Sequence, residues 1–386
     1  MGDQPVMKVP FNLATRLGSE DRFVIDAIHS GRLSGDGAYS RRCEGYAEGY
    51  LGSGNVLLTS SGTHALEMAA MLLDLSPGDE VIMPSFTFTS TATAFVLRGA
   101  RPVFVDVRPD TMNIDETCIE AAITPRTRAI VVVHYGGVAC QMDRVMELAT
   151  AHGLAVIEDA AHALGGLWRD RPLGTIGDIS AFSFHETKNL TSGGEGGMIW
   201  IRDPALFARA QVMREKGTNR GAFRAGKVAK YEWMDIGSSF LMSDVSAAYL
   251  WPQMSAIDLI TRQRRSICDT YGTAFADIIA SGRITVQETP AGTYAPGHMF
   301  YMKLRDEADR DAFAAAARAK GVLAVSHYVP LHSAPAGRRF GRFVGQDAVT
   351  TRDSRRLVRL PVFYNMTRAQ RDLVIGTALT FFADTP

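Results

Sequence analysis

The most constraining feature of this sequence is a series of short apolar runs between residues 56 and 160, each separated from the next by a helical or turn-forming stretch. The runs VLLTS, EVIMPS, PVFVDV, AIVVVHY and LAVIEDA begin at residues 56, 80, 102, 129 and 154. Strands that alternate with amphipathic helices pair in parallel through right-handed crossovers and are buried on both faces. The pattern therefore predicts an α/β fold built on a parallel sheet.

The rest of the chain extends this pattern. AFSFHE (181–186) and GGMIWI (196–201) are close enough to pair like a hairpin, and helices are expected at about 21–30, 41–51, 115–122 and 243–279. Residues 285–386 carry a strand (HMFYMKL), a helix (ADRDAFAAAARAKG) and a terminal helix at about 368–382. A chain of 386 residues is long enough for two domains. We expect a large domain at 1–255, with an irregular arm at 1–20 and a mostly parallel mixed sheet, and a smaller C-terminal α/β domain at 256–386.

Composition excludes several classes of function. Lys plus Arg and Asp plus Glu both number 41, so a nucleic-acid or membrane-surface partner is not expected. The cysteines show no C-x-x-C pair and lie far apart, which argues against a disulfide framework and against a metal site. There is no apolar run of 18 residues and no signal-peptide pattern. A cytoplasmic location is therefore expected.

Polar residues that follow the strands are the candidates for a site, because ligands of parallel sheets sit beyond the carboxyl ends of the strands. The stretch SSGTHAL (60–66) ends a strand, turns and starts a helix. The free N–H groups of such a helix start, with the Thr63 hydroxyl, form an anion site suited to phosphate. An ordinary Ser/Thr N-cap is the commoner use of these residues.

The fifth strand ends in two carboxylates, Glu158 and Asp159, and His162 follows. A buried Asp159 at the strand end would hold a ring nitrogen protonated, although a structural Asp that caps the next turn fits the position equally well. Glu158 is expected to face solvent. His162 is a candidate to bind a phenolic oxygen, and a structural histidine is the alternative.

Lys188 lies in SFHETKN, between apolar residues and the run GGEGG. A lysine beside a desolvated strand end has a depressed pKa and attacks carbonyl groups, whereas most single lysines are solvated surface charges. GGEGG lacks the spacing of a dinucleotide fingerprint and leads into a strand. Its glycines instead allow the backbone to pass close to a ligand or another chain.

Taken together, these motifs resemble the sugar aminotransferases of the aspartate-aminotransferase fold, which make amino sugars for surface polysaccharides and antibiotics. SGT, PSFTF, VIEDAAH, SFHETKN and GGEGG match the motifs of this group in the same order, and the resemblance runs from about residue 10 to the end. The segments GDGAYSRRCE, PDTMNIDET, REKGTNR, DIGSSFLMSD and HYVPLH are most similar to the dTDP-4-amino-4,6-dideoxygalactose transaminases of the group.

The resemblance implies pyridoxal 5′-phosphate (PLP) as cofactor and assigns roles to residues. Lys188 is implied to be the Schiff-base lysine and proton shuttle, and Asp159 to pair with the pyridine nitrogen. The remaining implied cofactor contacts are the ring face for Phe88, the 3-oxygen for His162, and the phosphate for Gly62, Thr63 and Ser183.

Other implied contacts involve a second subunit and the substrate. Ser239 stands where many relatives have an asparagine that reaches the phosphate of the neighbouring subunit, so this contact is in doubt. A homodimer or dimer of dimers is implied. The candidates for contacts to the nucleotide sugar are Arg220, Lys227, Lys230, His327, Tyr328 and His332. A solvated loop for the first three and packing at the domain junction for the last three are the alternatives.

The reaction implied is amination of dTDP-4-keto-6-deoxyglucose to dTDP-4-amino-4,6-dideoxygalactose, with L-glutamate as donor and 2-oxoglutarate as product. Another nucleotide-linked 3-keto or 4-keto sugar is the alternative substrate. A sugar dehydratase of the same fold would carry histidine in place of Lys188. A PLP-binding regulator without enzymatic activity would need a DNA-binding module, for which the two domains leave no room.

Overall fold

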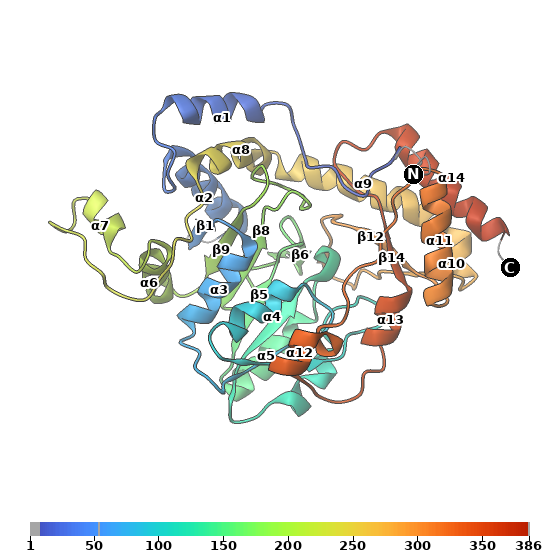
Figure 1. The fold of residues 1–386 in the computed structure, drawn as a ribbon, viewed down its shortest axis with the longest axis horizontal. Helices are drawn as coiled ribbons and strands as arrows, with labels where there is room; N and C mark the ends of the chain where they lie inside the picture. The colour runs from blue at the N-terminus through green and yellow to red at the C-terminus, as the bar shows by residue number, and fades with distance from the viewer. Residues whose placement is uncertain (1–7, 53–54, 385–386) are drawn as a thin grey trace.

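The computed structural model describes residues 8–52 and 55–384, and its centre is an eight-stranded mixed sheet (Figure 1). The strand order is β1-β9-β8-β5-β4-β2-β3-β13. The strands are β1 (Val56–Thr59), β2 (Glu80–Pro84), β3 (Arg101–Val105), β4 (Thr127–Val133), β5 (Ala155–Asp159), β8 (Ile179–Ser183), β9 (Gly197–Ile201) and β13 (Arg342–Phe343). The first seven residues of the expected N-terminal arm lie outside the described residues.

The sheet is parallel except at β9. From β8 to β13 every neighbouring pair is parallel, whereas β9 is antiparallel to both β8 and β1. The hairpin-like pairing of β8 with β9 is therefore confirmed. The expected parallel pairing of the first strand is wrong, because the returning β9 occupies the place beside β8 and leaves β1 only an antiparallel neighbour.

Helices connect the parallel strands and cover the sheet. They include α3 (Gly62–Leu72), α4 (Thr89–Val96), α5 (Met142–His152) and α6 (Pro204–Arg214). The helix expected at 115–122 is instead two short 3₁₀ turns, Glu116–Cys118 and Glu120–Ala122. Pro125 disfavours helical geometry in the residue before it, so the chain cannot lengthen these turns into a helix.

The long helical region expected at 243–279 is three helices, α8 (Asp244–Ser255), α9 (Ile257–Ala274) and α10 (Ala276–Ala280). Figure 1 shows α9 running from the large sheet to a second group of elements near the C-terminus. That group contains β10 (Thr285–Val286), β12 (Phe300–Lys303), β14 (Leu357–Leu360), α11 (Glu307–Ala319) and α14 (Arg368–Asp384). It has its own apolar cluster, which also takes in Val9 from the N-terminal arm.

The division expected at 255/256 falls between α8 and α9 and stays a prediction. One segment beyond it, β13, pairs with β3 and extends the large sheet. The 3₁₀ turn Leu331–Ser333, α12 (Pro335–Phe340) and α13 (Thr350–Arg356) belong to the same stretch of chain. A three-stranded sheet of β11 (Thr293–Tyr294), β6 (Leu167–Trp168) and β7 (Arg171–Pro172) also joins segments from both sides of the division.

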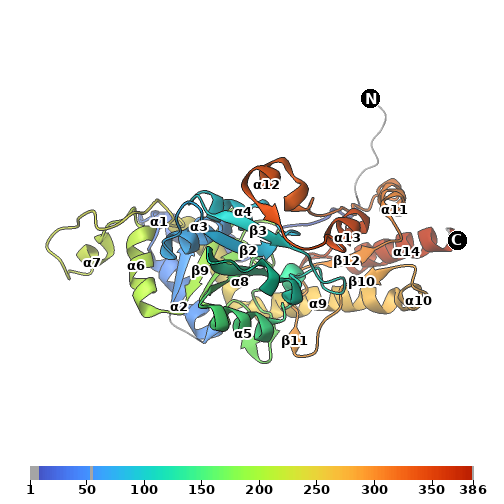
Figure 2. The same cartoon turned by 90° about the horizontal axis from the view of Figure 1, so that it is seen from below.

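Two features of the surface bear on function. Helices α1 (Glu20–His29) and α2 (Ala38–Leu51) pack against α8, whereas α7 (Arg220–Arg224) and its loop project away from the rest of the chain in both views (Figures 1 and 2). Within the described part of the chain, no helix combines the length and the apolar character needed to cross a membrane.

Candidate active site

A cavity of about 780 Å³ lies at the carboxyl ends of the parallel strands, where a ligand of such a sheet is expected. Residues at or just after the ends of β1, β2, β4, β5 and β8 line it, and much of the remaining wall comes from segments nearer the C-terminus. Of the residues singled out in the sequence, the lining includes Gly62, Thr63, Phe88, Asp159, His162, Ser183, Lys188, His327 and Tyr328. The fold therefore brings together motifs that are up to 266 positions apart in the chain (Gly62 to Tyr328).

The start of α3 forms one end of the cavity. The Ser61 hydroxyl caps the helix by accepting a hydrogen bond from the His64 N–H at 3.0 Å. The N–H groups of Gly62 and Thr63 lie in the first turn and have no acceptor within the helix. A Cβ at Gly62 would lie only 3.0 Å from Cβ of Ser183, so glycine lets the helix approach β8. The cap and the anion site thus coexist, since Ser61 satisfies one N–H and leaves two for a phosphate.

Asp159 ends β5 in the interior of the cavity and is 6% exposed. One carboxylate oxygen accepts a hydrogen bond from the Thr91 hydroxyl at 2.7 Å, and the other accepts from the Ala161 N–H at 3.2 Å. The Thr91 hydroxyl also bonds the Thr87 hydroxyl at 2.8 Å. The carboxylate is therefore held firmly while it faces the cavity, which suits a partner that carries a positive charge.

Lys188 lies in a turn after β8, where its N–H donates to the His185 carbonyl oxygen at 2.9 Å. The pKa of Lys188 is lowered to about 8: burial lowers it most, the Asp159 carboxylate partly opposes burial, and the positive charge of Arg359 adds to the lowering. Lys188 is therefore not a solvated surface lysine. Near physiological pH a much larger fraction of such an amine is neutral than of an ordinary lysine, so it is a better nucleophile.

His162 is almost fully buried and stacks on His298, with ring centroids 4.1 Å apart. Burial holds the pKa of His162 well below its usual range, so the ring is neutral. Its Nδ1 accepts a hydrogen bond from the Gly136 N–H at 3.4 Å, which places the proton on Nε2. His298 in turn bonds the side-chain oxygen of Asn189 at 2.8 Å. The ring is therefore prepared to donate one hydrogen bond from Nε2.

The opposite wall carries an aromatic pair. The rings of His327 and Tyr328 stack 3.6 Å apart, and Nδ1 of His327 lies 2.6 Å from the Tyr135 hydroxyl. Phe88 caps the space between this pair and α4, and its ring is 56% exposed although it is a large apolar group. An exposed aromatic face on a cavity wall is a surface on which a planar ring can stack.

Some expected residues do not line the cavity of this chain. His332 bonds the Ser85 hydroxyl at 2.6 Å and the Asp347 carboxylate at 3.1 Å, which fits the packing alternative. Arg220 lies 3.4 Å from the Glu215 carboxylate. Lys227, Lys230 and Ser239 are exposed on the segment that carries α7.

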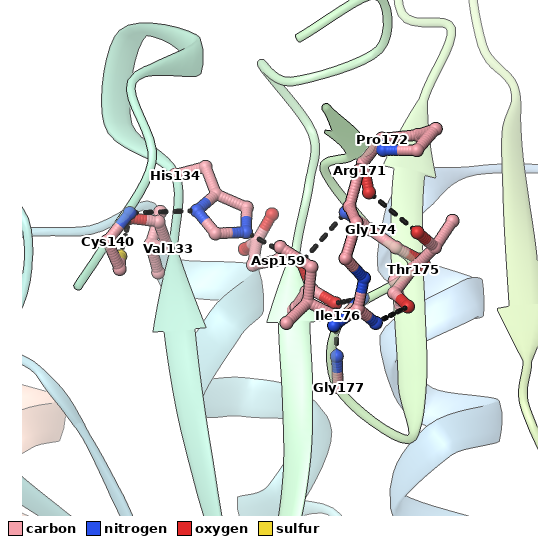
Figure 3. Close-up of polar contacts among 12 residues, drawn as sticks. Val133, His134, Cys140, Asp159, Arg171, Pro172, Gly174, Thr175, Ile176 and Gly177 are labelled. Atoms are coloured by element: carbon pink, nitrogen blue, oxygen red, sulfur yellow. Dashed lines mark hydrogen bonds and ion pairs between the residues drawn. The ribbon is translucent and has the colours of Figure 1, made fainter. Parts of the chain in front are cut away.

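Glu158 is buried, so the expectation that it faces solvent is wrong. Its carboxylate accepts hydrogen bonds from His134 Nε2 at 2.8 Å and from the N–H groups of Gly174, Ile176 and Gly177 at 2.7, 2.7 and 2.5 Å. Figure 3 shows His134 on one side of the strand that ends at Asp159 and these three residues on the other. The network ties the turn at 174–177 to β5 and supports the strand that presents Asp159.

Sequence reasoning also missed Arg359, Arg264 and His298 on the cavity wall. None of them belongs to a motif that follows a strand of the large sheet. Their place in the site depends on how the C-terminal segments pack over the carboxyl ends of that sheet.

Comparisons with known proteins identify the family of this chain. The family model described as the DegT/DnrJ/EryC1/StrS aminotransferase family matches residues 18–379. The spore coat polysaccharide biosynthesis protein SpsC of Bacillus subtilis is 33% identical over 95% of this chain and 97% of its own. The GDP-perosamine synthase of Caulobacter vibrioides is 31% identical over 97% of this chain and 98% of its own.

Solved structures show the same fold. The aminotransferase TlmJ of Streptoalloteichus hindustanus superposes with a TM-score of 0.90 at 30% identity, covering 98% of this chain and 100% of TlmJ. Spr1654 of Streptococcus pneumoniae in its PLP form superposes with a TM-score of 0.86 at 25% identity, covering 97% of this chain and 99% of that one.

Proposed function

Because this chain belongs to the DegT/DnrJ/EryC1/StrS aminotransferase family, we propose that it transfers the amino group of L-glutamate to C4 of a nucleotide-linked 4-keto sugar. The chain is a sugar aminotransferase of the aspartate-aminotransferase fold, and its family depends on PLP. One observation carries the proposal for the site. A helix start with free N–H groups, a buried carboxylate and a lysine of depressed pKa line one cavity.

The chemistry of the residues that line the cavity suits the cofactor. The N–H groups of Gly62 and Thr63, with the Ser183 hydroxyl, would hold the phosphate. Asp159 would pair with the pyridine nitrogen, Phe88 would cover the ring face, and His162 would donate from Nε2 to the 3-oxygen. When bound, PLP supplies an electron sink that makes the carbon next to the transferred nitrogen acidic.

The chain's own groups then handle the protons. Lys188 would be the group that binds the cofactor covalently and, once released, moves a proton to or from the reacting carbon. A pKa of about 8 makes its amine an acceptor or a donor near physiological pH at small cost. Asp159 would carry the negative charge that keeps the ring nitrogen protonated, and its hydrogen bonds from Thr91 and Ala161 hold it in place.

We further propose dTDP-4-keto-6-deoxyglucose as substrate and dTDP-4-amino-4,6-dideoxygalactose as product. One proton donor serves one face of the reacting carbon, so the orientation of the bound sugar decides whether the new amine is axial. His327 and Tyr328 line the cavity and are the candidates within this chain to orient the sugar. The similarity to a GDP-perosamine synthase leaves the base and the sugar to be tested, and a 3-keto sugar is the alternative.

A homodimer or dimer of dimers is proposed as the active assembly. Ser239, Arg220, Lys227 and Lys230 lie off the cavity of their own chain, on an exposed segment around a helix that projects from the fold (Figure 2). In a dimer they would reach the cavity of the partner, with Ser239 near the phosphate and the three cations near the nucleotide diphosphate.

The test is an incubation of the purified enzyme with L-glutamate and a panel of dTDP-, UDP- and GDP-linked 4-keto and 3-keto sugars. Mass spectrometry identifies the aminated product, and proton NMR gives its configuration. We expect the dTDP-4-keto sugar to react fastest, with a small H3–H4 coupling that marks an axial amine. A large coupling would indicate the gluco epimer, and amination at C3 would overturn the proposed position.

A further inference from the structure

Arg359 stands on the wall of the cavity opposite α3, at a place that no sequence motif indicated. It belongs to β14, which lies beside β12 in the smaller sheet (Figure 1). Its backbone exchanges two hydrogen bonds with Val325, at 2.8 and 3.1 Å, and its Nη2 donates to the Ser326 carbonyl oxygen at 3.1 Å. The guanidinium carbon lies 4.5 Å from the centre of the Phe11 ring. These contacts fix the direction of the side chain.

The guanidinium nevertheless lacks a charged partner. Its Nε is buried and makes no hydrogen bond, and within residues 8–52 and 55–384 no carboxylate lies within 4.0 Å of it. A buried N–H of a charged group without an acceptor loses its hydrogen bond to water and destabilises the fold. Such a group is expected where a ligand supplies the missing acceptor.

The surroundings favour an anion over a neutral ligand. Arg264, 1% exposed, also lines the cavity; it donates to the carbonyl oxygens of Gly297, His298 and Val362, while its Nη1 has no partner. In the described part of the lining, Asp159 is the one buried carboxylate, since the Glu195 side chain is 68% exposed at the rim. The wall that holds Arg359 therefore carries positive charge without a matching negative group.

We propose that Arg359 binds the α-carboxylate of the amino donor, a role that rests on the proposed function. This carboxylate is attached to the carbon that bears the transferred nitrogen, so it must lie near Lys188 during the reaction. Arg359 and Lys188 line the same cavity, and the positive charge of Arg359 contributes to the lowered pKa of Lys188. The diphosphate of a nucleotide sugar is separated from the reacting carbon by the sugar ring and belongs farther out. A guanidinium with a free N–H is the group best suited to orient a carboxylate.

Binding of glutarate, a dicarboxylate that cannot react, tests this role without turnover. Calorimetry on the PLP-loaded enzyme would compare the parent with Arg359→Gln, Arg359→Lys and the control Arg355→Gln, which removes an exposed arginine of α13 outside the cavity. Loss of a charged hydrogen bond predicts a Kd raised about 10- to 100-fold in Arg359→Gln. We expect a smaller rise in Arg359→Lys and no change in Arg355→Gln. An unchanged Kd in both Arg359 variants, or no glutarate binding by the parent, would overturn the proposal.

The two half-reactions separate this role from contact with the diphosphate. Arg359→Gln should raise the L-glutamate concentration needed for half-maximal bleaching of the cofactor by the same factor as the glutarate Kd. The pyridoxamine-loaded variant should still aminate the keto sugar within about threefold of the parent. A loss confined to the sugar half-reaction would assign Arg359 to the nucleotide and refute the proposal. If glutarate binds as expected but no keto sugar reacts, the substrate proposal fails while the role of Arg359 stands. Should Arg359→Gln not fold, Arg359→Lys carries the same comparison.

Discussion

Asp159 and its neighbour Glu158 are adjacent carboxylates with separable roles, and replacing each by its amide tests this. In Asp159→Asn the amide oxygen can still accept from the Ala161 N–H. The amide nitrogen can donate to the Thr91 hydroxyl, which can turn to donate to Thr87. Both hydrogen bonds are therefore retained, and the free energy of unfolding should fall by no more than about 1 kcal/mol.

The chemistry should respond far more strongly. The amide side chain of the Asp159→Asn variant carries no charge to hold a ring nitrogen protonated, and breaking a buried charge pair costs roughly 3–5 kcal/mol. At about 1.4 kcal/mol per factor of ten, kcat should fall by at least about 100-fold. The assay is single-turnover bleaching of the cofactor by L-glutamate, with urea denaturation to measure stability. Near-normal kcat in a folded Asp159→Asn enzyme would refute the catalytic role and support a structural one.

Glu158→Gln is the matched control, and it should behave in the opposite way. The Glu158 carboxylate accepts four hydrogen bonds, and an amide would turn an N–H toward at least one of these donors. We expect a loss of about 3–5 kcal/mol in the free energy of unfolding. Any residual folded enzyme should retain kcat within a few-fold of the parent. Equal losses of kcat in the two variants would show that the damage is general and would remove the argument for Asp159.

The dependence of the free energy of unfolding on pH in the acidic range tests the role of Glu158. Burial by itself would raise the pKa of this carboxyl, but the hydrogen bond and charge of His134 and the backbone N–H groups outweigh it, so the pKa lies below its usual range. A lowered folded-state pKa contributes stability above the ordinary carboxyl pKa of about 4.3 and loses it as the pH falls through the lowered value. The stability gap between the parent and Glu158→Gln should therefore be widest near neutral pH and narrow in acid.

Three further predictions concern Lys188 and the assembly. Borohydride reduction of the loaded enzyme should fix the cofactor on the peptide that contains Lys188, and Lys188→Ala should lose turnover; labelling of another lysine would sink the assignment. Because burial lowers the pKa of Lys188 to about 8, the rate of PLP uptake by apoenzyme should rise with pH up to about 8 and then level off; a rate that keeps rising to pH 10 would indicate an ordinary lysine. Light scattering should show a dimer or tetramer, and mixing inactive Lys188→Ala chains with inactive Ser239→Asp chains should restore activity; mixtures that stay inactive would place Ser239 outside the partner's site.

Many of the residues that line the cavity could be predicted from local sequence, for a physical reason. Strands buried on both faces must be apolar throughout, so β2, β4 and β5 are visible as runs of Val and Ile. Parallel strands present their carboxyl ends at one edge, so the residues after them, such as Thr63 and Lys188, were expected to meet there. The chemistry of each residue type at such a place follows from the same rule, which is why the anion site and the lysine could be proposed before any coordinates.

Tertiary structure decided what depends on contacts between distant segments. β1 pairs antiparallel because the chain returns along β9 beside it, and the segment VLLTS gives no sign of this pairing. The side chains of Glu158 and Asp159 point to opposite faces of one strand. The turn at 174–177 decides whether the Glu158 side chain contacts solvent or backbone N–H groups. Arg359 lies on β14 of the smaller sheet, far along the chain from the motifs that follow the strands of the large sheet, yet it lines the same cavity. The sequence by itself determined the strands and the kinds of groups at their ends, because apolar patterning and the residue types that follow a strand are local properties of the chain. The tertiary structure decides the partners of those groups, because the partners come from segments that are distant in the sequence.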